Sequence, residues 1–246
     1  MEKGTAEPGS DVCLRSLGME LEMPALPFDK YVLLASYAKL ARCYDPMSGL
    51  AKDRAHIVSG AFDSVPATGL FALATALMSQ PDVALVEPSF ARETLRKVCT
   101  TVAAIPTGMG LLPHFVKRGD GKIRIHPGTE FSTVDSALYF HSVLLASELL
   151  GDKETKAELL KAIRAIDFKR LRLRDGIISH GVKDDGTTVL EHGWADWGGE
   201  TALVVLLESL SGADLPTPMM KHSGKAWQGT GFITELQSLF FPDFDK

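Results

Sequence analysis

The chain has 246 residues, of which 45% are hydrophobic and 23% are charged, so it is long enough to bury a substantial core as one domain. Its formal net charge of −5 and pI of about 5.8 exclude the basic surface that a phosphate backbone requires, and nucleic acid is not expected as a partner. No apolar run reaches the roughly 18 residues of a membrane span. No cofactor and no metal are expected, because phosphate loops, dinucleotide fingerprints and metal-ligand patterns are absent from the sequence.

Residues 1–27 are rich in glycine, proline and polar groups, which predicts a tail or a strap laid over the domain. Residues 28–246 are predicted to form that single domain. The first two dozen residues lack the apolar stretch of a signal peptide. The protein is therefore expected to be either cytoplasmic or numbered from a form whose leader was removed, and the sequence leaves the compartment open.

Buried and amphipathic helices alternate along the chain. Stretches that are apolar or small all round predict inner helices, and stretches with one polar side predict outer helices. The predicted helices are 31–43, 66–78 (inner), 87–105 (outer), 132–150 (inner), 153–166 (outer), 201–210 (inner) and a short 233–240. Short β-prone pieces at 122–125 and 176–179 predict hairpins within loops. The expected fold class is therefore all-α or close to it: helical hairpins arranged as an α/α toroid or an incomplete toroid.

Acidic residues stand at the starts of two predicted inner helices. Glu130 and Asp135 lie on either side of the start of helix 132–150, and Glu200 directly precedes helix 201–210. Glycosidic bonds are cleaved by pairs of carboxyl groups, and sugar rings bind aromatic faces such as those in the connecting loops. The pattern predicts a carbohydrate site at the mouth of a helical barrel, with these three acids as the catalytic candidates.

Each acid also has a structural interpretation. With Ser132 as N-cap, Asp135 completes a pattern like a capping box, and an acid in a first helical turn favours the helix dipole. The dipole accounts equally well for Glu200, and solvation in a loop accounts for Glu130. Capping and catalysis are compatible in one residue, so both interpretations stay open.

Several loop residues are candidate sugar contacts. Trp194 and Trp197 lie three apart in a glycine-rich acidic loop, which favours a stacking platform, although one of them is expected to anchor the loop to the core. Asp53 and Arg54 are either a structural ion pair or a sugar contact, and His114 is either a hydrogen-bonded loop histidine or a ligand-binding one. The predicted substrate-binding set is Asp53, Arg54, His114, Phe115, Trp194 and Trp197.

Five sequence blocks share one order and spacing with a known family. The blocks are 44–54, 66–70, 110–115, 130–137 and 197–200. They resemble the glucoamylase-like domain of bacterial endo-β-1,2-glucanases and cyclic β-1,2-glucan synthases, over roughly residues 28–212. The resemblance implies the N-terminal half to two thirds of an (α/α)6 toroid that acts on a β-linked glucan. It also implies a periplasmic or extracellular location if a leader has been removed.

These observations are consistent with two functions. The first is a glycoside hydrolase-like protein that binds and hydrolyses a β-glucan by carboxylate acid–base catalysis, with an oligo- or polysaccharide as its partner. The alternative is a noncatalytic scaffold or carbohydrate-binding module. Because an incomplete toroid exposes apolar inner helices, this alternative requires a second copy or another chain to cover them.

Overall fold

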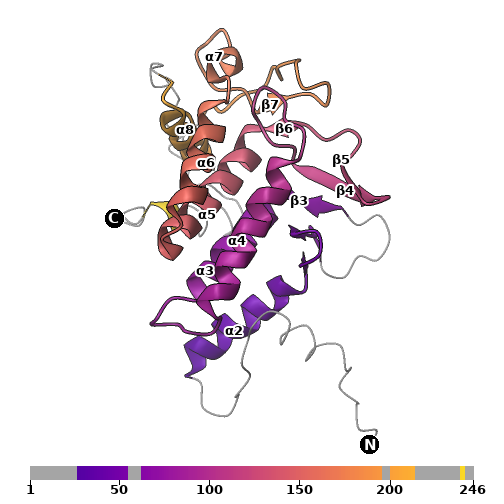
Figure 1. Cartoon of the computed structure of the whole chain (residues 1–246). Helices are drawn as coiled ribbons and strands as arrows, with labels where there is room; N and C mark the ends of the chain where they lie inside the picture. The colour runs from indigo at the N-terminus through magenta and orange to yellow at the C-terminus, as the bar shows by residue number, and fades with distance from the viewer. Residues whose placement is uncertain (1–26, 55–61, 196–199, 214–238, 242–246) are drawn as a thin grey trace, which may run out of the picture.

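The computed structural model describes residues 27–54, 62–195, 200–213 and 239–241 (Figure 1). Within these ranges the protein is rich in helices, with three small antiparallel sheets. The predicted tail at 1–27 lies outside the described residues except for Pro27, as do Trp197 and most of the predicted helix 233–240. Among the helices described, none combines the length and the apolarity needed to cross a bilayer.

The six long helices expected in this part of the chain are present, with ends that differ from the predicted ones by a few residues. They are α2 (Phe28–Ala41), α3 (Val65–Met78), α4 (Pro88–Ala103), α5 (Thr133–Leu150), α6 (Lys153–Arg164) and α8 (Thr201–Ser211). A further short helix, α7 (Phe168–Leu171), was not predicted from the sequence. The side chain of Asp167 caps it by accepting the backbone N–H of Arg170.

The predicted alternation of helix types is present. Helices α3 and α5 are buried along most of their length, whereas α4 and α6 bury one side only. Helix α5 packs against α3, α4, α6 and α8 (Figure 1). At Gly69 a Cβ atom would stand 3.0 Å from the Cα atom of Tyr139, so glycine is what lets α3 approach α5 this closely. The core of the molecule therefore lies along the α3–α5 contact.

The strands are short. They are β1 (Tyr44–Asp45), β2 (Leu50–Ala51), β3 (Asp63–Ser64), β4 (Phe115–Gly119), β5 (Lys122–Ile125), β6 (Phe131–Ser132) and β7 (Gly181–Val182). They pair antiparallel as β1–β2, β3–β4–β5 and β6–β7. The β-prone piece at 122–125 is strand β5, in a hairpin with β4. The piece at 176–179 forms only isolated bridges, at Ile178 and Ser179. The chain is thus not purely helical. These strands hold in place the segments that lead into the helices.

Two of the strands lead directly into the two most buried helices. Strand β3 ends in Ser64, which caps α3, and strand β6 ends in Ser132, which caps α5. Strand β7 pairs with β6 through Gly181, where φ is 151° and a Cβ atom would lie 2.0 Å from the carbonyl oxygen of Phe131. Only glycine permits that approach. The β6–β7 pair therefore brings the segment around residue 181 to the start of α5.

Candidate active site

A cavity of about 850 Å³ lies at the starts of α3 and α5, and we call it the entrance cavity. Its volume is that of a typical small-ligand pocket. The described residues that line it include five acids, one lysine and two histidines: Asp53, Glu130, Asp135, Asp184, Glu200, Lys183, His114 and His180. The excess of acids gives the entrance cavity a negative potential, which is suited to neutral or cationic ligands and opposes anionic ones.

All three predicted catalytic carboxylates line this one cavity. Glu130 comes from the segment before β6, Asp135 from the first turn of α5, and Glu200 from the N-cap position of α8. The folding of α5 against α8 brings the last of these to the other two, although it is distant in sequence. The structure thus brings the acidic set together around a common opening.

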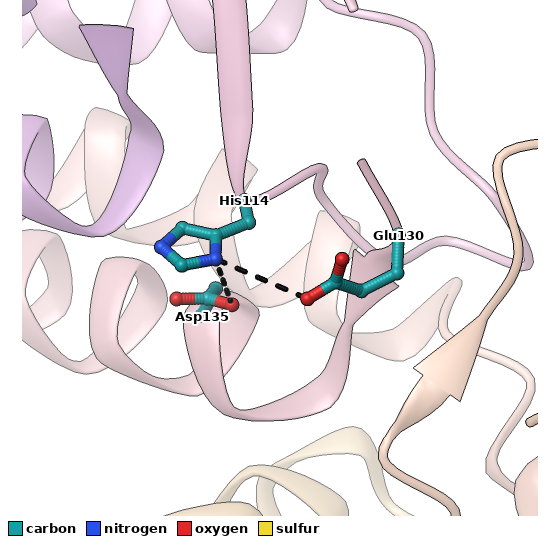
Figure 2. A group of neighbouring side chains, drawn as sticks. All are labelled: His114, Glu130 and Asp135. Atoms are coloured by element: carbon teal, nitrogen blue, oxygen red, sulfur yellow. Dashed lines mark ion pairs between the residues drawn. The ribbon is translucent and has the colours of Figure 1, made fainter. Parts of the chain in front are cut away.

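His114 stands between two of these acids (Figure 2). Its Nδ1 atom is 3.5 Å from Oδ2 of Asp135 and 3.9 Å from Oε1 of Glu130. The His114 ring stacks on Phe115 with a centroid separation of 3.6 Å. The backbone N–H of His114 donates to the carbonyl oxygen of Glu130. The ring is therefore held by its neighbours with Nδ1 facing the two carboxylates.

Burial changes the proton affinity of two acids. The side chain of Asp135 is only 9% exposed. Burial raises its pKa, and the nearby charge of Glu130 adds to this, while His114 and the Ser132 side chain oppose it. Burial also raises the pKa of Glu200, and the charge of Asp135 contributes further. Either group therefore holds its proton to a higher pH than an ordinary carboxyl group does, which is what a general acid requires.

Trp194 forms a fixed wall of the entrance cavity. Its Nε1–H donates to Oγ1 of Thr133 at 2.9 Å, and its ring centroid lies 4.4 Å from that of His180. Trp194 is therefore anchored to the start of α5 while it lines the cavity. Its predicted companion, Trp197, lies outside the described residues.

The remaining predicted contacts divide between the cavity and its surroundings. Asp53 lines the cavity and forms an ion pair with Arg54, whose Nε atom is 3.4 Å from Oδ2 of Asp53. Arg54 is exposed and is not among the lining residues. Phe115 is not among them either, because its ring packs on His114 and on Phe62. Arg54 and Phe115 are thus placed to support cavity residues rather than to form its wall.

Three lining residues, His180, Lys183 and Asp184, were not singled out as site residues from the sequence. They belong to the segment that β7 brings to α5. This segment was predicted as a loop between two helices, and it carries no motif that marks a binding role. Its glycine at position 181 was one available signal that another backbone passes close by.

One group of described residues could hold a metal ion. The donor atoms of His114, Glu130 and Asp135 all lie within 4.8 Å of one another. No metal was expected from the sequence, because it contains no recognised metal-ligand pattern.

Comparisons with known proteins give a structural likeness. No family model matches the sequence, and a search of curated proteins finds no significant match. The endo-β-1,2-glucanase from Chitinophaga pinensis, solved with sophorotriose and glucose, has a TM-score of 0.58 and 14% identity, covering 75% of this chain and 47% of that chain. A glucoamylase candidate from Bacteroides fragilis has a TM-score of 0.56 and 15% identity, with coverages of 77% and 48%. The β-1,2-glucanase from Parabacteroides distasonis has a TM-score of 0.53 and 13% identity, with coverages of 75% and 28%.

The chain spans about half the length of the first two structures and less of the third. At identities this low, the likeness establishes the fold alone. The resemblance to glucoamylase-like proteins that five sequence blocks predicted is confirmed at that level. The protein therefore shares its fold with about half of the length of endo-β-1,2-glucanase and glucoamylase-like structures.

Proposed function

We propose that the protein is a glycoside hydrolase that cleaves a β-linked glucan, with β-1,2-glucan as the first substrate to examine. The observation that carries the proposal is that Glu130, Asp135 and Glu200 line one cavity. Support comes from the raised pKa of Asp135 and Glu200 and from the fold that the chain shares with β-1,2-glucanases. Paired carboxyl groups of this kind are what hydrolysis of a glycosidic bond requires.

We also propose that residues 28–246 form one domain, which is part of an (α/α)6 toroid, and that residues 1–27 form a tail. The alternation of buried α3 and α5 with amphipathic α4 and α6 supports this arrangement. In a toroid, the loops before the inner helices converge on the central hollow, which is consistent with a cavity at the starts of α3 and α5.

The distances constrain the roles of the three acids. Oxygens of Glu130 and Asp135 lie within 4.8 Å of each other, closer than the roughly 6.5–9.5 Å between the groups of an inverting pair. If an inverting reaction uses two of these three acids, Glu200 is therefore one of them. In that case Glu200, with its raised pKa, protonates the leaving oxygen. Glu130, whose side chain is 43% exposed, or Asp135 then activates water on the opposite side of the sugar.

The sugar contacts proposed with this mechanism are those that border the reacting groups. Trp194 offers an aromatic wall fixed by its bond to Thr133. Asp53 and His114 offer hydrogen-bonding groups for sugar hydroxyls. Trp197 remains a proposed contact from its place in the sequence. Arg54 and Phe115 act through Asp53 and His114, which they contact.

The test is hydrolysis of linear β-1,2-glucan, measured as the release of reducing ends. It compares wild type with Glu130→Gln, Asp135→Asn and Glu200→Gln. Loss of the acid or of the base should lower kcat/KM at least about 100-fold. The matched control is Asp184→Asn, an acid of the same cavity to which no role is assigned, and its kcat/KM should change less than about tenfold. Unchanged hydrolysis in all three variants would remove the assignment.

The noncatalytic function remains a second candidate because α2 exposes apolar residues. Phe28 is 81% exposed, and Tyr31, Val32 and Leu33 in the following turn are exposed as well. Four exposed apolar side chains within six residues of one helix are consistent with a contact to a partner. Calorimetry that detects glucan binding without product release, together with a dimer or larger assembly in light scattering, would favour this function. Product release by a monomer would exclude it.

A further inference from the structure

The three groups in Figure 2 face one another without being hydrogen-bonded. The separations from Nδ1 of His114, 3.5 Å to Asp135 and 3.9 Å to Glu130, exceed the roughly 2.7–3.2 Å of an N–H···O hydrogen bond. Within the described part of the chain, no hydrogen bond satisfies the His114 ring. A nitrogen and two carboxylate oxygens thus converge on a space between them.

That space has the dimensions of a metal site. Ligand atoms at about 2.0–2.2 Å from one ion lie about 3.3–3.6 Å apart in a tetrahedron. The distance from His114 to Asp135 falls within this range, and the distance from His114 to Glu130 is slightly longer. The donor oxygens of Glu130 and Asp135 lie within 4.8 Å of each other, and the 43% exposed side chain of Glu130 is free to move toward the other two ligands.

Two of the three ligands are already held in place. Asp135 is fixed in the first turn of α5, where its backbone N–H donates to Ser132 Oγ. His114 is fixed by stacking on Phe115 and by the bond from its backbone to Glu130. A site whose ligands are oriented by their neighbours loses less conformational freedom when the ion binds.

The surrounding charge also favours a cation. Besides Glu130 and Asp135, three more acids line the entrance cavity, against one lysine among its described lining residues. In the described residues, no lysine or arginine forms an ion pair with Glu130, Asp135 or Glu200. A divalent ion would supply the positive charge that these carboxylates lack.

We propose that His114, Glu130 and Asp135 bind a divalent transition-metal ion of the Zn²⁺ or Mn²⁺ type, with its remaining coordination positions open to the cavity. The imidazole ligand favours such ions over Ca²⁺ and Mg²⁺, which prefer oxygen ligands in larger number. The bound ion engages two carboxylates of the proposed hydrolytic set, so it inhibits hydrolysis. Only this inhibition rests on the proposed function, because binding itself does not depend on it.

The test is titration of metal-free protein with ZnCl₂ in a calorimeter, and with MnCl₂ followed by electron paramagnetic resonance. Wild type should bind one ion per chain, and His114→Gln, Glu130→Gln and Asp135→Asn should each weaken binding at least tenfold. The matched control is His126→Gln, a histidine whose Nδ1 contacts Pro127 and which is not among the lining residues. This variant should bind as wild type does.

Absence of Zn²⁺ and Mn²⁺ binding by wild type, or equal affinity in wild type and the three variants, overturns the proposal. His114→Gln keeps both carboxylates, so it decides the result if either carboxylate variant fails to fold. Stoichiometric binding by a protein that releases no sugar would support the metal site and reject the hydrolase. Sugar release that Zn²⁺ leaves unchanged would reject the inhibition.

Discussion

Helices α3 and α5 begin in the same way, but the acids beside their first turns have different partners. Each follows a two-residue strand that ends in a capping serine. Four residues later a hydroxyl, of Thr68 in α3 and of Ser136 in α5, donates to the carbonyl oxygen of that serine. The same hydroxyl accepts a backbone N–H from a neighbouring segment, Ala51 in one case and Leu112 in the other, at 2.9 Å in both. One local design thus fixes both entrances.

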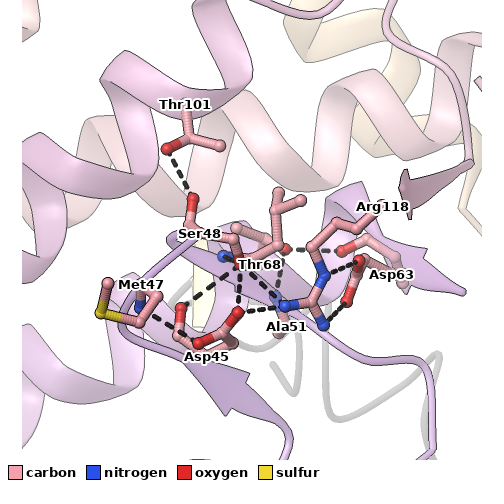
Figure 3. Close-up of polar contacts among 10 residues, drawn as sticks. Asp45, Met47, Ser48, Ala51, Asp63, Thr68, Thr101 and Arg118 are labelled. Carbon is pink, nitrogen blue, oxygen red and sulfur yellow. Dashed lines mark hydrogen bonds and ion pairs between the residues drawn. The ribbon is translucent and has the colours of Figure 1, made fainter. Parts of the chain in front are cut away.

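The acids at the two entrances differ in their partners. At α3, Asp63 accepts hydrogen bonds from Nε and Nη2 of Arg118 at 2.7 and 3.1 Å (Figure 3). The same guanidinium also pairs with Asp45. At α5, the ion-pair partner of Glu130 and Asp135 among the described residues is His114, at 3.5 Å or more. The pairing of Asp63 with Arg118 holds β3 to β4, although burial still raises the pKa of Asp63. Glu130 and Asp135 have no lysine or arginine partner among the described residues. The difference separates a carboxylate that is paired with an arginine from carboxylates that we propose to act on a ligand.

The largest expected effect on stability is that of Arg118→Met. The substitution removes the guanidinium from Asp45 and Asp63, and the Asp63 side chain, only 3% exposed, is left as a buried charge without a partner. Loss of one member of such a pair should lower the free energy of unfolding by about 3 kcal/mol. Urea denaturation followed by circular dichroism measures this change.

The control for this prediction lies on the adjacent strand. Arg124 in β5 pairs with Asp120 at 3.8 Å, and both side chains are mostly exposed. Arg124→Met should therefore change the free energy of unfolding by less than about 1 kcal/mol. Equal losses in the two variants would show that the buried pairing at the α3 entrance is not what stabilises it.

Local sequence signals predicted part of the α5 entrance. A serine before an apolar run, with an acid three positions later, marks the cap of α5 and the place of Asp135. The pairing of Arg118 with Asp45 and Asp63 joins residues 73 and 55 positions apart, so no local pattern could show it. His180 reaches the cavity only because β7 pairs with β6. Spacing along the chain fixes helix ends, while these contacts depend on tertiary packing.

Phe115 shows a different limit of sequence analysis. An aromatic residue beside a histidine in a loop is equally consistent with stacking on a sugar and with stacking on that histidine. The structure places its ring against His114. Composition identifies the kind of contact, and only the backbone conformation selects the partner.

An intermediate effect is expected from neutralising the cavity acids in the double variant Asp135→Asn and Glu200→Gln. The raised pKa of both groups means that their ionised forms destabilise the folded state. The variant should therefore be more stable than wild type at neutral pH, by about 1 kcal/mol. As the pH falls through the raised pKa values and below the ordinary carboxyl values, wild type is protonated too and the difference should vanish.

Asp45→Asn should change the stability at neutral pH in the opposite direction. Hydrogen bonds with Ser48 and Met47 and the charge of Arg118 outweigh burial and lower the pKa of Asp45. The ionised form therefore stabilises the fold above the unfolded-state pKa, and this stability is lost as the pH falls through the lowered value. Asp45→Asn should be less stable than wild type at neutral pH and equal to it in acid. Thermal unfolding from about pH 2 to 8 compares the variants, and a stability change of the same sign for both would contradict the contrast between Asp45 and the cavity acids.

Effects of similar size on stability test the shared design of the two entrances. Thr68→Val and Ser136→Ala each leave one buried backbone N–H, of Ala51 or Leu112, without its acceptor, which should cost about 1 kcal/mol in unfolding free energy. Ser142→Ala is the control, because the buried hydroxyl of Ser142 has no hydrogen-bond partner in the described structure and its removal should cost nothing.

The two hydroxyl variants should nevertheless differ in activity. The N–H that Ser136 binds belongs to Leu112, two residues before His114, so its loss loosens the segment that carries the ring between Glu130 and Asp135. Hydrolysis of β-1,2-glucan should fall several-fold in Ser136→Ala and stay unchanged in Thr68→Val, since a small displacement of a positioned group affects rate more than stability. Equal activities at equal stability would mean that the α5 entrance does not position the reacting groups.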